Sequence, residues 1–291
     1  MRLCILAIFK NERHIINEWV DHHISVGFDH IYLMDNMSTD NYKIDPALAP
    51  YVTIKKYPKG QRALYRECLQ LVKTNADWIA VIDLDEFIYS KEGSVRQAIT
   101  QLPPSVTRID IQMKNFGISA FKVPKSKILA QAYYSPDSAK HPKCISRTRG
   151  LTQINVHTSR HTPKNNRVYY PHTSTKLCIN HYRYQSVEYL YGIKEQRGGG
   201  VNKQKYTQHA VLAHAKRTPS FIEDKWLCDN SNAVIARCHE RNGPGPATEI
   251  YPSSSWAKQL PFIKELEAEY CEVEGHLAEK NVPPEQEDAR T

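Results

Sequence analysis

The sequence has no long hydrophobic run. Its 291 residues contain no apolar stretch near the roughly 20 residues that a membrane-spanning helix needs. The apolar start, residues 3–9, is shorter than a secretory leader, has no small-residue cleavage site and runs into the polar residues 10–12. We therefore expect a buried first strand and a cytoplasmic protein, and a peripheral contact with a membrane surface is left open.

Cysteines are few and scattered. The seven of them form no C-x-x-C pair, so neither a zinc knuckle nor a disulfide framework is indicated, and we expect reduced thiols. With 41% hydrophobic and 24% charged residues, the composition is that of a globular protein and excludes a disordered or fibrous chain.

Acidic residues are rare in the middle of the chain. Residues 101–220 hold 20 Lys and Arg against 4 Asp and Glu, whereas residues 1–100 hold 12 against 13 and residues 221–291 hold 7 against 14. A segment this basic usually faces an anionic partner, such as nucleic acid, a phosphorylated substrate or a membrane surface. A solvated surface without a partner is the alternative.

The first 85 residues alternate between apolar runs and helical periodicity. The apolar runs, typical of parallel strands covered on both faces, are residues 3–9, 30–34, 52–54 and 78–82. The helical periods cover residues 15–24 and 61–73. We predict an α/β fold with a Rossmann-like, mostly parallel sheet flanked by helices. Two weaker signals follow, a strand at 151–157 and a C-terminal helix at 262–279.

Polar residues follow three of the expected strands. They are residues 10–12, 35–40 and 83–86. Because ligands of such sheets bind beyond the carboxyl ends of the strands, we expect the three clusters to form one site.

Asp83 and Asp85 stand one residue apart directly after the strand expected at 78–82. Two carboxylates in that place can share Mg²⁺ or Mn²⁺, which prefer hard oxygen ligands and keep positions open for diphosphate oxygens. The metal would neutralise charge on a leaving nucleoside diphosphate. A solvated turn is the alternative, but the preceding apolar run and the following Glu86-Phe87 favour the metal.

Several short motifs follow one another along residues 3–200. They are Phe9-Lys10-Asn11-Glu12, Glu18-Trp19-Val20 with His23, Gly27 to Tyr32, Asp35-Asn36-x-Ser38-x-Asp40, Ile82 to Phe87, Asn115-Phe116-Gly117 and Asn180 to Ser186. Together they resemble glycosyltransferase family 92 and related family 2-like glycosyltransferases. The resemblance implies a GT-A fold, a nucleotide-sugar donor and an inverting reaction.

The resemblance also implies roles for single residues. It places Phe9, Asn11 and Glu12 near the nucleotide. Asp35 would contact the base or ribose, Arg62 would approach the phosphates, and Asp83 would contact the ribose or the metal. Asp85 would be a firm metal ligand. For Asp35, ordinary turn chemistry is an equal alternative. His181 resembles the late histidine that completes the metal site in GT-A enzymes, and His157 is its competitor.

An inverting transfer needs a general base near the acceptor hydroxyl. Between residues 101 and 180 the carboxylates are Asp110, within an expected strand, and Asp137, within a loop. We expect Asp137 to be the base, with Glu86 as a second candidate.

The sequence therefore predicts a metal-dependent transferase that moves a sugar from a nucleotide-diphosphate-sugar, a UDP-sugar by expectation, to a glycan or glycolipid. The basic segment favours an anionic or lipid-linked acceptor, through Lys122, Lys125 and Lys127 and then Lys140, Lys143, Arg147 and Arg149. Residues 1–220 would form the catalytic domain, with a nucleotide-sugar half at about 1–100 and an acceptor half at about 101–220. A helical extension and tail would follow at 221–291.

Two other functions are alternatives. A sugar nucleotidyltransferase would need a glycine-rich loop after the first strand, where residues 9–12 have no glycine. A nucleic-acid-binding module would explain the basic segment and its tyrosines, but no recognisable binding motif supports it.

Overall fold

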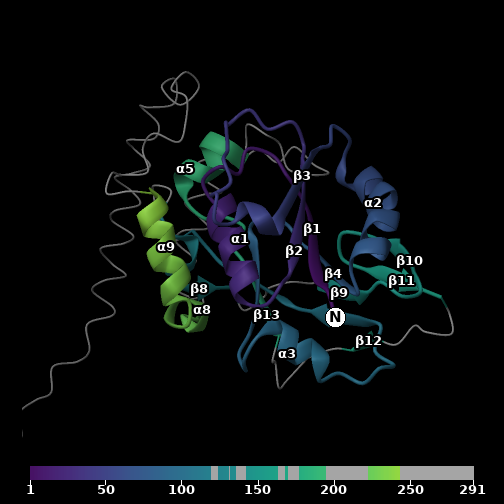
Figure 1. The fold of residues 1–291 in the computed structure, drawn as a ribbon. Helices are drawn as coiled ribbons and strands as arrows, with labels where there is room; N and C mark the ends of the chain where they lie inside the picture. Colours follow the sequence, from purple (N-terminus) through teal and green to yellow (C-terminus); the bar gives the residue numbers. More distant parts are fainter. Residues whose placement is uncertain are drawn as a thin grey trace, which may run out of the picture.

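A computed structural model describes residues 1–118, 124–130, 132–135, 142–162, 168–169, 177–194 and 222–242 (Figure 1). Within these residues a central sheet carries helices on both faces. No helix in these ranges is long and apolar enough to cross a membrane.

The central sheet has seven strands among the described residues, in the order β12-β6-β9-β4-β1-β2-β3. Their bounds are β1 Leu3–Phe9, β2 His30–Asp35, β3 Val52–Lys56, β4 Trp78–Val81, β6 Arg108–Ile111, β9 Lys143–Arg147 and β12 Val168–Tyr169. β9 runs antiparallel to both of its neighbours, and every other neighbouring pair is parallel. The predicted α/β fold with a mostly parallel sheet is confirmed.

Smaller sheets and the helices surround the central sheet. The additional strands are β5 Glu86–Ser90, β7 Met113–Asn115 and β13 Leu177–His181 in one sheet, the hairpin β10 Leu151–Ile154 with β11 Ser159–His161, and β8 Tyr133–Tyr134 with β14 Ile222–Glu223. The α-helices are α1 Ile16–Ser25, α2 Gln61–Asn75, α3 Val95–Thr100, α4 Lys127–Ala130, α5 Val187–Tyr189, α8 Trp226–Asp229 and α9 Asn232–Asn242. A 3₁₀ turn covers Ala49–Tyr51, and a π-helical turn covers Leu190–Lys194.

Strand β1 divides the core because successive side chains of a strand point to opposite faces. Leu3 and Ile5 pack with α1, α3 and α9 on one face. Cys4 and Leu6 pack with α2 and β10 on the other face. A strand buried on both faces has to be apolar throughout, which explains the unbroken hydrophobic run.

Helix α1 is tied to β5, the strand that begins directly after Asp85. The Trp19 indole donates to the backbone oxygen of Glu86 at 2.8 Å. The His22 Nε2 atom lies 2.7 Å from the Ile88 oxygen, and His23 accepts from the Ile88 amide at 3.2 Å. The motif residues of α1 therefore position the strand that carries the expected metal site.

Helix α9 packs against α1 through ion pairs. Asp21 lies 2.6 Å from both Arg237 and Arg241, so the first part of the predicted extension contacts the part of the chain predicted as the catalytic domain. The predicted strand at 151–157 is found as β10, shorter and within a hairpin. The helix expected at 262–279 lies outside the described residues, and the division into domains stays a prediction.

Candidate active site

The carboxyl ends of β1, β2 and β4 lie at one edge of the sheet because these strands are parallel neighbours. After β4 the chain makes a tight turn, in which the Glu86 amide donates to the Asp83 oxygen at 3.1 Å. The Asp83 amide in turn donates to the Glu86 carboxylate at 3.0 Å. This turn leads the chain out of the central sheet into β5 of the three-stranded sheet, with Asp85 directly before that strand.

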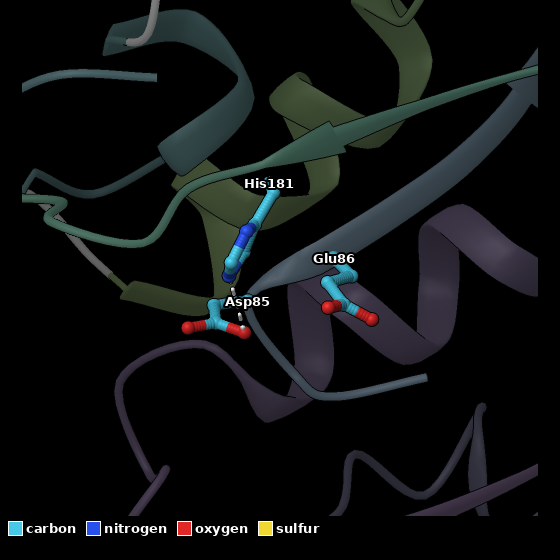
Figure 2. Close-up of side chains that lie close together, drawn as sticks. All are labelled: Asp85, Glu86 and His181. Carbon is cyan, nitrogen blue, oxygen red and sulfur yellow. Dashed lines mark ion pairs between the residues drawn. The ribbon is translucent and has the colours of Figure 1, made fainter. Parts of the chain in front are cut away.

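Asp85, Glu86 and His181 form a cluster that could hold a metal ion (Figure 2). One ligand atom from each lies within 4.8 Å of the others. β13 runs antiparallel to β5 and pairs His181 with Glu86, so the pairing of the two strands brings the histidine to the carboxylates. The His181 Nε2 atom lies 3.6 Å from an Asp85 oxygen.

The orientation of His181 suits a metal ligand. Its Nδ1 atom lies 2.7 Å from the amide oxygen of Asn115 on β7. An imidazole that donates from Nδ1 keeps a lone pair on Nε2, and such a partner is what usually fixes a metal-binding histidine. Two carboxylates and one neutral imidazole are a donor set that fits Mn²⁺ or Mg²⁺.

Asp83 is held by two side chains on the other side of the turn. Its carboxylate accepts from the Gln61 amide at 3.0 Å and from the Lys143 ammonium at 2.9 Å. Lys143 also lies 3.1 Å from Glu86, and its side chain is almost fully buried. Asp83, expected at the ribose or metal, is therefore outside the cluster of Asp85, Glu86 and His181, and its expected role stays a prediction.

Burial raises the pKa of Glu86 to about 7, against the opposing effect of the Lys143 ammonium. Although burial lowers the pKa of Lys143, the carboxylates of Asp83 and Glu86 raise it above its usual value. Lys143 therefore stays charged and compensates two carboxylates at the centre of the site. Lys143 was expected to face an acceptor with the rest of the basic segment, and the structure corrects this by burying it against the two carboxylates.

The residues expected near the nucleotide lie together at the ends of β1 and β2. Phe9 pairs with Asp35 in the strand register. Asn11, at a φ of 54°, donates its backbone amide to Ser38 at 3.0 Å. Both carboxylate oxygens of Asp35 accept hydrogen bonds within the turn, from the Ser38 amide at 2.7 Å and from the Tyr42 hydroxyl at 3.1 Å. These contacts match the turn alternative for Asp35, and a ligand contact stays a prediction.

Three further expected residues are less informative. Glu12 is buried and its backbone oxygen accepts the amides of Ile15 and Ile16 at the start of α1. Arg62 lies in α2, as expected, but its side chain is outside what the structure describes, and so is the whole of Asp137. Asp110 is buried with Arg108, 2.8 Å away, which suits a structural ion pair.

The structure also corrects the expectation that Lys127 faces an acceptor. Lys127 is fully buried and donates to the Pro124 oxygen at 2.8 Å. Burial lowers its pKa to about 8. Its backbone amide donates to the buried carboxylate of Glu18, so the start of α4 is anchored in the core.

His157, the competitor of His181, lies in the β10–β11 loop near the Pro142 oxygen and is not in the metal cluster of the described residues. Lys122 and Lys140 fall outside the described residues.

Comparisons with known proteins agree with the motifs. The family model described as glycosyltransferase family 92 matches residues 1–225. The family 92 protein Os08g0121900 of Oryza sativa subsp. japonica is 22% identical over 200 residues, which are 63% of this chain and 33% of that protein. RCOM_0530710 of Ricinus communis is 24% identical over 197 residues, 63% of this chain and 35% of that protein. The matched region thus covers about a third of the length of these relatives.

Likeness to solved structures is weaker. The mannosyltransferase PcManGT from Pyrobaculum calidifontis, solved with GDP-Man and Mn²⁺, has a TM-score of 0.39 and 12% identity, over 97% of this chain and 88% of that one. HddC from Yersinia pseudotuberculosis has a TM-score of 0.33 and 10% identity, over 61% and 92%. At such TM-scores these resemblances establish neither fold nor function. Because the family model matches residues 1–225, the chain belongs to glycosyltransferase family 92.

Proposed function

We propose that this chain transfers a sugar from a nucleotide-diphosphate-sugar, a UDP-sugar in the first instance, to a glycan or glycolipid acceptor. The reaction would be inverting and would depend on Mn²⁺ or Mg²⁺. The observation that carries the proposal is the cluster of Asp85, Glu86 and His181 at the sheet edge where α/β folds bind ligands. Membership of a glycosyltransferase family favours this function over a nucleotidyltransferase or a nucleic-acid-binding module.

Asp85, Glu86 and His181 would hold the metal, with Asn115 fixing the tautomer of the imidazole. When bound, the metal supplies positive charge for the leaving diphosphate. Lys143 keeps the Asp83 carboxylate in place and prevents two neighbouring carboxylates from repelling each other. Phe9, Asn11 and Asp35 would line the nucleotide side of the same edge.

The general base is best assigned to Asp137. Glu86, the second candidate, is almost fully buried and its carboxylate already accepts from Lys143 and from the Asp83 amide. Both donors contact its Oε2 atom, and the cluster with Asp85 and His181 gives the carboxylate a role as a metal ligand. We therefore assign Glu86 to metal binding and keep Asp137 as the proposed base.

The acceptor would carry anionic groups, because residues 101–220 hold 20 basic residues against 4 acidic ones. Part of that excess has a structural use, since Lys127 is buried and Lys143 neutralises the site. The remaining excess supports an anionic or lipid-linked glycan. A cytoplasmic location and peripheral membrane contact stay predictions.

The test is the release of UDP from a panel of UDP-sugars, measured with Mn²⁺ and again with excess chelator. We expect release from at least one donor with Mn²⁺, and its loss with chelator. Release that is unchanged by the chelator would contradict the metal, and an inert protein with every UDP-sugar would contradict the UDP-sugar donor.

A further inference from the structure

We infer that a hollow beside Asp83 is a binding site for one acidic sugar unit of the acceptor. The inference rests on the proposed function, which it extends by naming a subsite. The hollow has a volume of about 650 Å³ and lies between α2 and the β10–β11 hairpin, which stand side by side in Figure 1. Its volume is within the range of about 300–1,000 Å³ that is usual for small-molecule sites.

Both walls of the hollow are connected to Asp83. On the α2 wall, the side chain of Gln61 hydrogen-bonds to Tyr65, which lines the hollow, and also donates to Asp83. On the hairpin wall, His157 lies 3.2 Å from the Pro142 oxygen, and the next residue is Lys143, which binds Asp83. A ligand in the hollow would therefore contact walls that are connected to Asp83 through Gln61 and Lys143.

The lining suits a sugar. The amide groups of Gln153 and Asn155 can donate to and accept from sugar hydroxyls, and the Thr152 hydroxyl, which donates to the Arg160 oxygen, can accept. Apolar side chains of the lining, Leu69 among them, offer surface for the carbon-bound hydrogens of a sugar ring. A partly apolar wall with a small number of precisely placed polar groups is the usual composition of a small-molecule site.

The charge of the lining favours an acid. Arg66 provides a permanent positive charge and a planar fork of donors, which matches a carboxylate or phosphate. Among the described residues that line the hollow there is no Asp or Glu. The neighbouring Glu67 is engaged elsewhere, because its carboxylate accepts from Tyr57 and from Lys59, each at 2.8 Å. The ligand class is thus a sugar with a carboxylate or phosphate group.

His157 is one of the residues that line the hollow. His157 was the second candidate for a metal ligand, but it lines the hollow and is not in the metal cluster of the described residues. Because its Nδ1 atom donates to the Pro142 oxygen, the neutral imidazole offers Nε2 as an acceptor for a sugar hydroxyl. Contact with the acceptor is therefore the role that the structure supports for His157.

The test is a titration followed by protein NMR, without nucleotide or metal, with glucuronic acid, glucose 6-phosphate, glucose and inorganic phosphate as separate probes. We expect at least one acidic sugar to shift signals of the hollow and to bind at least about tenfold more tightly than glucose or inorganic phosphate. Arg66→Gln should weaken that binding about tenfold. Lys73→Gln removes the same charge from the same helix, outside the hollow, and should leave the binding unchanged.

Three results would overturn the subsite: no binding of either acidic sugar, equal binding by Arg66→Gln, or inorganic phosphate binding as tightly as the sugar acids. None of these depends on the transferase reaction. Binding of UDP with Mn²⁺ to the same samples separates the two proposals, because a protein that binds Mn²⁺–UDP but no acidic sugar contradicts the subsite alone. A protein that binds the sugar acid but never UDP contradicts the proposed donor site instead.

Discussion

The Nδ1 atom of His181 lies 2.7 Å from the amide oxygen of Asn115, on the adjacent parallel strand β7. An amide oxygen can only accept, so the imidazole donates from Nδ1 and presents the lone pair of Nε2 to Asp85. The two residues come from motifs 66 positions apart, and neither motif alone indicates the contact. Strand pairing therefore selects the nitrogen that can bind a metal.

Asn115→Leu should lower the affinity for Mn²⁺ by about 10–100-fold, because it removes the acceptor that orients His181 while keeping the size of the side chain. Isothermal titration with Mn²⁺ measures the effect. Asn230→Leu, an exposed substitution directly after α8, is the control and should bind Mn²⁺ as the wild type does. Equal affinity of Asn115→Leu and wild type would show that the contact does not serve a metal.

Replacing the two candidate histidines should have different effects. His181→Ala removes a proposed ligand and should weaken Mn²⁺ binding, whereas His157→Ala should leave it unchanged because His157 is outside the cluster of the described residues. The same titration decides between them. A larger loss in His157→Ala would move the metal site to the β10–β11 loop.

Lys143→Met should destabilise the fold by about 3 kcal/mol, because it leaves two carboxylates without their buried cation. Added Mn²⁺ should restore more stability to this variant than it adds to the wild type, since a bound cation can take over the neutralisation. Urea unfolding with and without Mn²⁺ measures both effects. The exposed substitution Lys73→Met is the control, and an equal Mn²⁺ response in all three proteins would contradict this role of Lys143.

The sequence predicted the parallel part of the fold because its strands are unbroken apolar runs, as in Leu3–Phe9. It did not reveal that β9 is antiparallel or that β5 leaves the central sheet, since pairing direction depends on long-range contacts rather than on local periodicity. The expected metal ligands Asp85 and His181 are brought together, and Glu86, expected as a base, joins them. Lys143 was expected to face the acceptor, because the sequence alone does not distinguish a buried lysine of a basic segment from an exposed one.

Stability should fall as the pH decreases from 6.5 towards 4. His22 is buried, and burial lowers its pKa to about 4 from the ordinary 6.5. Between these values the unfolded chain binds a proton that the folded chain excludes, so the contribution is complete above pH 6.5 and is lost below it. The loss is about 3 kcal/mol for this group. Urea unfolding from pH 7 to pH 4.5 measures it, and His22→Gln should show a smaller decline. An identical pH slope in the two proteins would contradict a neutral buried His22.

The most direct test of the central claim, metal-dependent binding of a nucleotide at Asp85, is isothermal titration of UDP in the presence of Mn²⁺. We predict that the wild type binds UDP with Mn²⁺ and loses that binding with chelator. Asp85→Asn should bind UDP at least about tenfold more weakly, because one anionic ligand is removed, while Asp229→Asn, an exposed control, should bind as the wild type does. UDP binding that is unaffected by chelator and by Asp85→Asn would contradict the metal site and the function proposed for it.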